Sequence, residues 1–273
     1  MRTSTRRITS IGLGLGTLAA LIVLVALAGG SSKPAARPAR QHRDRAAAAR
    51  TAARTALVVK RYTIGRSVQG RRIDAVERAA SGATAAVLVV GCVDGNEPAG
   101  IAIARHLVSV RPPPRTALWI VPDLNPDGVA ADTRVNAHGV DLNRNFPWHW
   151  RPLGPRGDPQ YAGPHPLSEP ESRAGRGLIL QVRPRITIWF HQPEGLVDLS
   201  GGNARTEREF ARLVGLPAAQ LTRYPGSAVS WGNSVLPGTT AFVVELSAGP
   251  LSPASVSRYT RAILKLAAQA ARG

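Results

Sequence analysis

The stretch Gly91-Cys92-Val93-Asp94-Gly95-Asn96-Glu97-Pro98-Ala99-Gly100 is the part of the chain that decides its fold. It follows the apolar, β-branched run 85–90, which predicts a short buried strand closed by glycine. The Ala- and Ile-rich segment 98–108 predicts a helix with proline near its first turn. Asp94 and Glu97 are therefore expected at the carboxyl end of a strand, where open α/β sheets bind ligands. There they can converge on one cation, and a solvated turn with a helix-capping acid is the alternative.

Composition and charge limit the class of protein. The chain has 273 residues, a hydrophobic fraction of 44% and a net charge of +18. Its single cysteine, Cys92, excludes an intramolecular disulfide and is expected to pack as a small apolar residue. The basic charge favours anionic partners. Nucleic acid is not expected, because the chain has no RNA-binding signature and no zinc-finger cysteines, and no aromatic residues are interspersed in the basic run of residues 31–57.

The N-terminal part of the chain is not expected to belong to the folded domain. Arginines precede an apolar stretch with an Ala-x-Ala site, so residues 1–30 are predicted to be a signal peptide or signal anchor. Residues 31–57 form an Ala/Arg/Pro-rich basic linker, either a solvated spacer or a contact with an anionic wall polymer or the membrane surface. The folded domain, 58–273, is then expected outside the cytoplasmic membrane, either secreted or anchored.

Three further apolar runs predict buried strands, at 118–122, 186–190 and 240–244. The last two are followed directly by His191 and Glu245. The other expected elements are a turn between two strands at 65–71, a turn at 125–128, an irregular segment at 148–166, a helix opened by a capping box at 168–171 and running to about 180, a loop at 226–238, and a helix at 252–271.

The polar residues at these strand ends suggest one site. Taken singly, a histidine after a strand is more often a hydrogen-bonded core residue, and a glutamate there is more often solvated. Together, however, Asp94, Glu97 and His191 offer three zinc ligands with a fourth position left for water. Glu245 could then take the proton from that water.

Several motifs, in order, resemble the zinc carboxypeptidases of the carboxypeptidase A type. The closest branch is similar to the bacterial murein peptide amidases. The resemblance implies an α/β fold with a mixed, mostly parallel central sheet flanked by helices, over 58–273. The motifs that carry it are Gly65-x-Ser67-x-x-Gly70-Arg71, Gly95-Asn96-Glu97-Pro98-Ala99-Gly100, Asn125-Pro126-Asp127-Gly128, Asp141-Leu142-Asn143-Arg144-Asn145-Phe146-Pro147, Ser168-Glu169-Pro170-Glu171, Trp189-Phe190-His191-Gln192-Pro193 and Val243-Val244-Glu245-Leu246.

The same resemblance implies roles for individual residues and one Zn²⁺ per chain. Glu97 and His191 become zinc ligands, and Glu245 becomes the general base. The remaining roles are polarisation of the scissile carbonyl by Arg134, binding of the substrate's terminal carboxylate by Asn143 and Arg144, closure over the substrate by Tyr224, and the floor of the specificity pocket at Val229.

One position departs from the family pattern, because Asp94 stands where the family has its first histidine ligand. An aspartate can bind zinc, but it adds negative charge and should weaken both the activation of water and the selectivity for zinc. In the family, Asp141 would orient that histidine. Here Asp94 and Asp141 are expected to face each other as like charges unless a proton, a water or a cation intervenes.

Two hypotheses follow from this departure. In the first, Asp94 is a working ligand, and the protein is a zinc metallopeptidase that hydrolyses an amide bond in a cell-wall (murein) peptide or removes C-terminal apolar residues. In the second, the site binds metal poorly and the protein is a non-catalytic wall-peptide-binding protein. The first is favoured, because Glu245, Arg134, Asn143 and Arg144 are all present.

Overall fold

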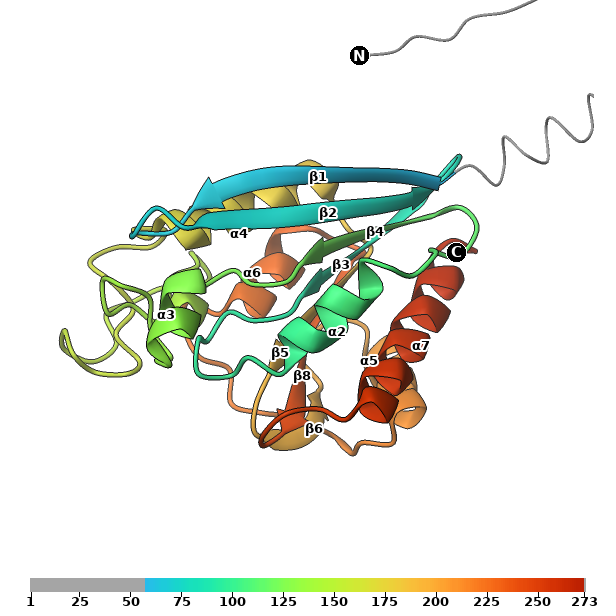
Figure 1. Cartoon of the computed structure of the whole chain (residues 1–273). Helices are drawn as coiled ribbons and strands as arrows, with labels where there is room; N and C mark the ends of the chain where they lie inside the picture. Colours follow the sequence, from blue (N-terminus) through green and yellow to red (C-terminus); the bar gives the residue numbers. More distant parts are fainter. Residues whose placement is uncertain (1–56, 273) are drawn as a thin grey trace, which may run out of the picture. The chain divides into compact units, whose positions relative to one another are not determined.

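Four strands with apolar residues on both faces form the centre of the sheet. They are β3 (Ala85–Val90), β4 (Thr116–Val121), β5 (Ile186–His191) and β8 (Thr240–Ser247). The computed structural model describes residues 57–272, and in it each of these strands is parallel to its neighbour in the order β4-β3-β5-β8 (Figure 1). Parallel strands buried on both faces explain why the sequence shows continuous apolar runs here.

Antiparallel strands extend the sheet on both sides, so the sheet is mixed, as predicted. On one side the hairpin of β1 (Leu57–Arg66) and β2 (Arg72–Ala80) joins β4 through β2. On the other side β6 (Glu194–Asp198) runs antiparallel to β8 and carries the short strand β7 (Ala218–Ala219). The order of the eight strands is β1-β2-β4-β3-β5-β8-β6-β7.

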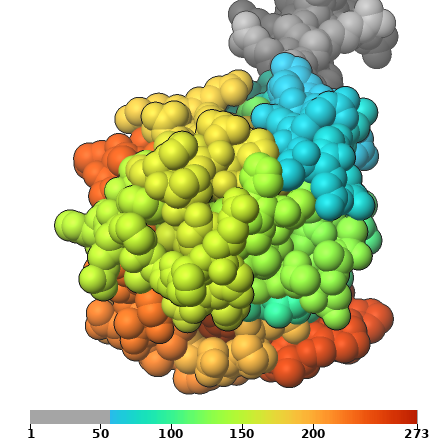
Figure 2. Space-filling view, turned by 90° about the vertical axis from the view of Figure 1, so that its left-hand side faces the viewer, coloured from blue at the N-terminus to red at the C-terminus, as the bar shows by residue number. Residues whose placement is uncertain are grey.

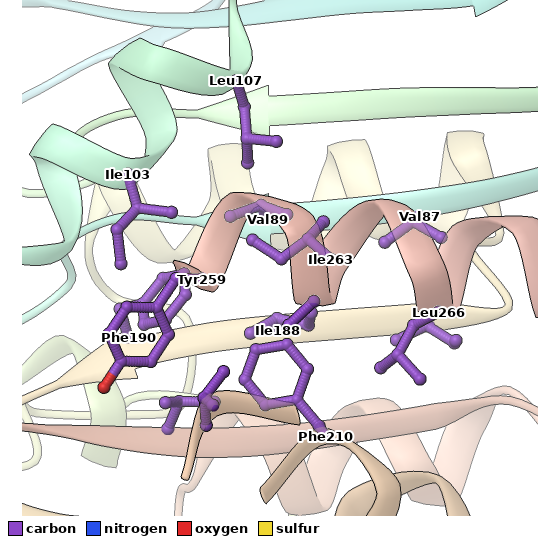
Figure 3. Packing of buried hydrophobic residues seen from close by; sticks show 14 of the residues in the cluster. Val87, Val89, Ile103, Leu107, Ile188, Phe190, Phe210, Tyr259, Ile263 and Leu266 are labelled. Atoms are coloured by element: carbon purple, nitrogen blue, oxygen red, sulfur yellow. The ribbon is translucent and has the colours of Figure 1, made fainter. Parts of the chain in front are cut away.

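Helices cover both faces of the sheet. On one face, α2 (Gly100–Leu107), α5 (Ala204–Val214) and α7 (Pro253–Ala270) bury their apolar sides against the strands. Figure 3 shows this packing, in which the Phe190 ring meets the Tyr259 ring edge-on at 6.0 Å between centroids. On the other face, α4 (Pro170–Val182) and α6 (Ala228–Val235) pack against residues such as Trp189.

The functional residues belong to the α4/α6 face at the carboxyl ends of the parallel strands. Along β5 the side chains alternate, so that Phe190 faces the α5/α7 core while Trp189 and His191 face the other side. The short helix α3 (Pro126–Ala131) and the 3₁₀ turn η1 (Leu142–Arg144) lie in the connections that follow β4. Figure 2 looks at this end, where the yellow-green segment between α3 and α4 makes up much of the visible surface.

The predicted loop at 226–238 is wrong, because residues 228–235 form α6. Its glycines and serines favour a loop by composition. The helix nevertheless forms because Ser227 accepts a hydrogen bond from the Ser230 N–H as N-cap and Trp231 is buried against Phe146. Tertiary burial therefore overrides local propensity here.

Three helix starts also differ from the prediction. Ser168 does not cap α4, since the N-cap is Glu169 and the Ser168 hydroxyl donates instead to the Glu169 carboxylate. The predicted turn at 125–128 is the start of α3, because the Asn125 side chain caps it by accepting from the Gly128 N–H. The helix predicted over 98–108 begins at Gly100, and β6 and α5 were not predicted.

Other features of the described residues bear on the predictions from sequence. Cys92 is buried and free, as predicted, and burial raises the pKa of its thiol. No helix within residues 57–272 combines the length and apolar character that crossing a membrane requires. The predicted signal segment and nearly all of the predicted linker lie outside the described residues.

Candidate metal and catalytic site

Asp94, Glu97 and His191 come together at the carboxyl ends of β3 and β5. The Nδ1 atom of His191 lies 3.0 Å from Glu97 Oε2 and 3.1 Å from Asp94 Oδ2. Potential ligand atoms of the three residues all lie within 4.8 Å of one another. Asp94 and His191 are buried, whereas 13% of the Glu97 side chain remains exposed. The predicted convergence of these residues on one position is therefore present.

The loop that carries Asp94 and Glu97 is held against α3. A Cβ atom on Gly95 would lie only 2.1 Å from the carbonyl carbon of Gly128, so only glycine permits this approach. The side-chain amide of Asn125 donates to the carbonyl oxygens of Val93 and Arg134. The cap of α3 thus fixes both the carboxylate loop and the backbone of the nearby arginine.

Arg134 bridges the carboxylates of the site. Its Nη2 lies 2.7 Å from Asp94 Oδ2, its Nη1 donates to Glu97 Oε1 at 3.0 Å, and its Nε donates to Asp141 Oδ2 at 2.8 Å. Asp141, fully buried, also caps η1 by accepting from the Asn143 N–H. The guanidinium is therefore the cation that separates the like charges of Asp94 and Asp141.

The same contacts set the protonation of the site. Burial by itself lowers the pKa of His191, but the facing carboxylates of Asp94 and Glu97 outweigh it and raise the pKa to about 10. Burial by itself raises the pKa of Asp94, yet His191 and Arg134 hold it below its ordinary value. Burial and the charge of Asp94 raise the pKa of Asp141. The ion-free site therefore holds a protonated histidine beside an ionised Asp94.

The donor set fits a zinc ion. Two carboxylates and an imidazole are zinc ligands, and three protein ligands leave a position for water or substrate. Asp94 Oδ1 is buried and has no hydrogen-bond partner among the described residues. Asp94 Oδ2 contacts charged nitrogens, but neither contact has the alignment of a hydrogen bond. A buried carboxylate with such free acceptor capacity is suited to a cation.

Glu245 lies beside this ligand set. It is in β8, directly opposite His191 in the parallel register of β5 and β8. Its Oε2 atom is buried without a hydrogen-bond partner among the described residues, and burial raises the pKa of its carboxyl group. A carboxylate of increased basicity next to a metal site is suited to accept a proton from water.

Most of the predicted site residues line one cavity of about 580 Å³. Asp94 and Asp141 do not line it, since both are buried, but both contact Arg134, which does. Those that do are Glu97, Arg134, Asn143, Arg144, His191, Tyr224, Val229 and Glu245.

Arg144 and Tyr224 form the cationic wall of this cavity. The guanidinium carbon of Arg144 lies 4.2 Å from the centre of the Tyr224 ring, and its Nε is buried without a partner among the described residues. A Cβ on Gly226 would lie 1.8 Å from the carbonyl oxygen of Arg144, so glycine is needed there. Asn143 also lines the cavity, and its Oδ1 accepts from the Ala228 N–H at the start of α6, so its predicted role in binding the substrate carboxylate stays a prediction.

Sequence reasoning missed one part of the cavity. Asp198 and Ser200, at and just beyond the end of β6, also line it, as do Leu221 and Arg223. The short sequence of β6, Glu-Gly-Leu-Val-Asp, has no continuous apolar run, and the strand is recognised only from its pairing with β8. The position of Asp198 in the cavity therefore could not be predicted from the sequence pattern of this strand.

The fold and the site together are suited to metal-dependent hydrolysis: a mixed α/β sheet carries a carboxylate–imidazole cluster and a glutamate of raised pKa at its carboxyl edge. A model of the zinc carboxypeptidase family matches residues 45–235. The chain therefore belongs to the zinc carboxypeptidase family.

Similar proteins include murein peptide amidase A of Escherichia coli K12, which is 29% identical over 157 residues. That match covers 53% of this chain and 64% of the relative, so it spans less than two thirds of the relative's length. Carboxypeptidase Z of Rattus norvegicus is 35% identical over 128 residues, which is 36% of this chain and 20% of that protein.

Solved structures support the same fold. The murein-tripeptide amidase MpaA from Escherichia coli O157 superposes with a TM-score of 0.62 at 25% identity, over 80% of this chain and 95% of that one. Carboxypeptidase A from Helicoverpa armigera gives a TM-score of 0.66 at 20% identity, over 78% and 68% of the two chains. The predicted fold class and family are thus confirmed.

Proposed function

We propose that this protein is a zinc-dependent amidase that acts outside the cytoplasmic membrane on a cell-wall (murein) peptide. The observation that carries the proposal is the juxtaposition of Asp94, Glu97 and His191 with Glu245 at one cavity. The similarity to murein peptide amidases supports the choice of substrate class. The basic, apolar N-terminal sequence supports export.

Asp94, Glu97 and His191 would hold the zinc ion. When bound there, zinc supplies Lewis acidity toward the carbonyl oxygen and increases the acidity of water. His191 offers Nδ1 to the ion, because that atom faces both carboxylates. His191 must lose its proton to do so, since only the neutral imidazole is a ligand.

Glu245 acts as the proton carrier. It accepts a proton from the attacking water and returns it to the nitrogen of the leaving amine, so that the carbonyl carbon gains oxygen as the C–N bond breaks. Burial favours this role, because it raises the pKa of the Glu245 carboxyl group and so makes the carboxylate a stronger base. Its place opposite His191 keeps the carrier next to the ligand set throughout the reaction.

The arginines of the cavity orient the substrate. The guanidinium of Arg144, held under Tyr224, binds the carboxylate of the leaving residue. Arg134 shares Nη1 and Nη2 with two prospective metal ligands. Those nitrogens would be free to polarise the substrate carbonyl if Glu97 and Asp94 held the ion, whereas Nε would remain with Asp141.

Hydrolysis by the full-length protein, purified without chelator, tests this proposal. Murein-derived peptides and ordinary peptides with apolar C-terminal residues are offered as substrates, with and without added zinc. Zinc-dependent release of the leaving residue from the murein peptides, abolished in Glu245→Gln, is expected. Turnover of neither substrate at any zinc concentration, with retained binding of the murein peptide, would contradict the enzyme and support the wall-peptide-binding alternative.

A further inference from the structure

The lining of the cavity includes a buried carboxylate, Asp198, that the hydrolytic mechanism does not use. Asp198, which lines the cavity, is 8% exposed. It lies at the end of β6, two residues beyond Leu196, which pairs with Glu245 in the antiparallel register of β6 and β8. Paired and alternate residues share a face, so Asp198 lies on the same face as Glu245 and about 7 Å further along the strand.

This carboxylate has room for a further donor. Asp198 Oδ1 accepts from the Leu221 N–H at 2.8 Å, and Oδ2 accepts from the Ser200 hydroxyl at 2.5 Å. An ionised carboxylate offers about four acceptor sites, so these two bonds fix its position without filling it. None of the ion pairs among residues 57–272 includes Asp198.

No charged side chain within residues 57–272 forms an ion pair with Asp198. Arg223 lines the same cavity, but it is exposed and its guanidinium lies over Gly201. The second acid nearby, Glu207, is buried and does not line the cavity, and its pKa is raised first by burial and then by the charge of Asp198. A buried carboxylate without a paired cation is costly unless it receives one. The side of the cavity that Asp198 lines is thus suited to a positively charged group.

We propose that Asp198 is a specificity-determining residue that binds an ammonium group at the end of the substrate's leaving residue. This rests on the proposed function and deepens it. The leaving residue places its carboxylate on Arg144 and its scissile nitrogen near Glu245, and its side chain runs along the face of β6 and β8 toward Asp198. An ammonium on a four-carbon stem suits that span. The structure thus favours a cationic or zwitterionic side chain over an apolar one, although Val229 carries no charge.

A matched pair of peptides tests this assignment. The probes are L-alanyl-γ-D-glutamyl-L-lysine and its norleucine analogue, which differ in the terminal ammonium. For the full-length protein with zinc, kcat/KM for the lysine peptide is expected to exceed that for the norleucine peptide by about 10- to 100-fold, as for a charge-assisted hydrogen bond. In Asp198→Asn, which keeps the size of the side chain, the ratio should fall to about one.

Asp74→Asn is the matched control, because it makes the same chemical change on β2, which is separated from β6 by four strands of the sheet. It should leave the ratio unchanged. Comparing the two peptides on the unsubstituted protein gives a result even if Asp198→Asn does not fold. Equal kcat/KM for the two peptides there would overturn the proposal while leaving the hydrolase intact.

Binding separates the failure of this proposal from the failure of the proposed function. If neither peptide is hydrolysed, the hydrolase fails, and the dissociation constants of the two peptides decide the role of Asp198. Tighter binding of the lysine peptide, lost in Asp198→Asn and kept in Asp74→Asn, would support the assignment. Equal binding of the two peptides would overturn it.

Discussion

Zinc binding should release a proton from His191. Without an ion, the carboxylates of Asp94 and Glu97 raise the pKa of His191 to about 10, so the imidazole is protonated at neutral pH. Zinc binds the neutral imidazole, and the ion therefore competes with this proton. At pH 7 the competition should weaken the apparent zinc affinity by about 1,000-fold, which is about 4 kcal/mol at 1.36 kcal/mol per pH unit.

The direction of the pH dependence follows from the raised pKa. Below about pH 10, each increase of one pH unit raises the fraction of neutral His191 about tenfold. The apparent affinity for zinc should therefore rise about tenfold per pH unit between about pH 6 and 8. Titration calorimetry in buffers of different ionisation enthalpy counts the protons released. About one proton per zinc is expected near pH 7 from the protonated His191.

Two controls make this prediction specific. In Asp94→Asn the charge that contributes most to raising the pKa of His191 is lost, so the pKa of His191 in the zinc-free variant, followed by NMR titration, should be lower than in the zinc-free unsubstituted protein. Asp74→Asn, on the distant strand β2, should release as many protons per zinc as the unsubstituted protein. A zinc affinity that does not change with pH, with no proton released, would refute the charge assignment of the site.

Three further substitutions test separate parts of the account. Glu245→Gln should lower kcat by about 10²- to 10⁴-fold with zinc content unchanged, as expected for loss of a general base; near-normal kcat would contradict the role. Gly226→Ala places a Cβ 1.8 Å from the Arg144 carbonyl oxygen and should therefore displace Arg144. The variant should raise KM for peptides with a free C-terminal carboxylate more than for their amides. An equal rise in KM for both would count against Arg144 as the carboxylate-binding residue. Burial and the charge of Asp198 raise the pKa of Glu207 to about 7, so the free energy of unfolding should fall as pH rises from about 4.5 to 7. In urea titrations, Glu207→Gln should therefore have a free energy of unfolding about 1–3 kcal/mol higher than the unsubstituted protein at pH 8, but not at pH 5. An equal increase at both pH values would contradict the titration of Glu207.

The strand ends were predictable from sequence because their signals are local. Each apolar run is short, continuous and closed by a polar residue, as at His191, and parallel strands bring such ends to one edge. The position of Asp94 on the loop after β3 was predictable for the same reason. The like charges of Asp94 and Asp141 were expected to need a third partner, and the structure identifies it as Arg134.

Other features depend on tertiary contacts that no local pattern encodes. The sequence of α6 is rich in glycine and serine, and it becomes a helix because Trp231 is buried against Phe146. Asp198 belongs to a strand that is defined by its pairing with β8, so its place in the cavity could not be predicted. Arg134 likewise forms ion pairs with three carboxylates, of which Asp94 and Glu97 are far from it in the sequence.

The metal content of the full-length protein, purified without chelator and compared with Asp94→Ala, tests the central claim most directly. The account predicts about one zinc per chain in the unsubstituted protein and clear loss in the variant, because Asp94, Glu97 and His191 form the ligand set. Thermal unfolding confirms in parallel that the variant folds. Absence of metal even after zinc is supplied, or full zinc content in Asp94→Ala, would contradict Asp94 as a ligand.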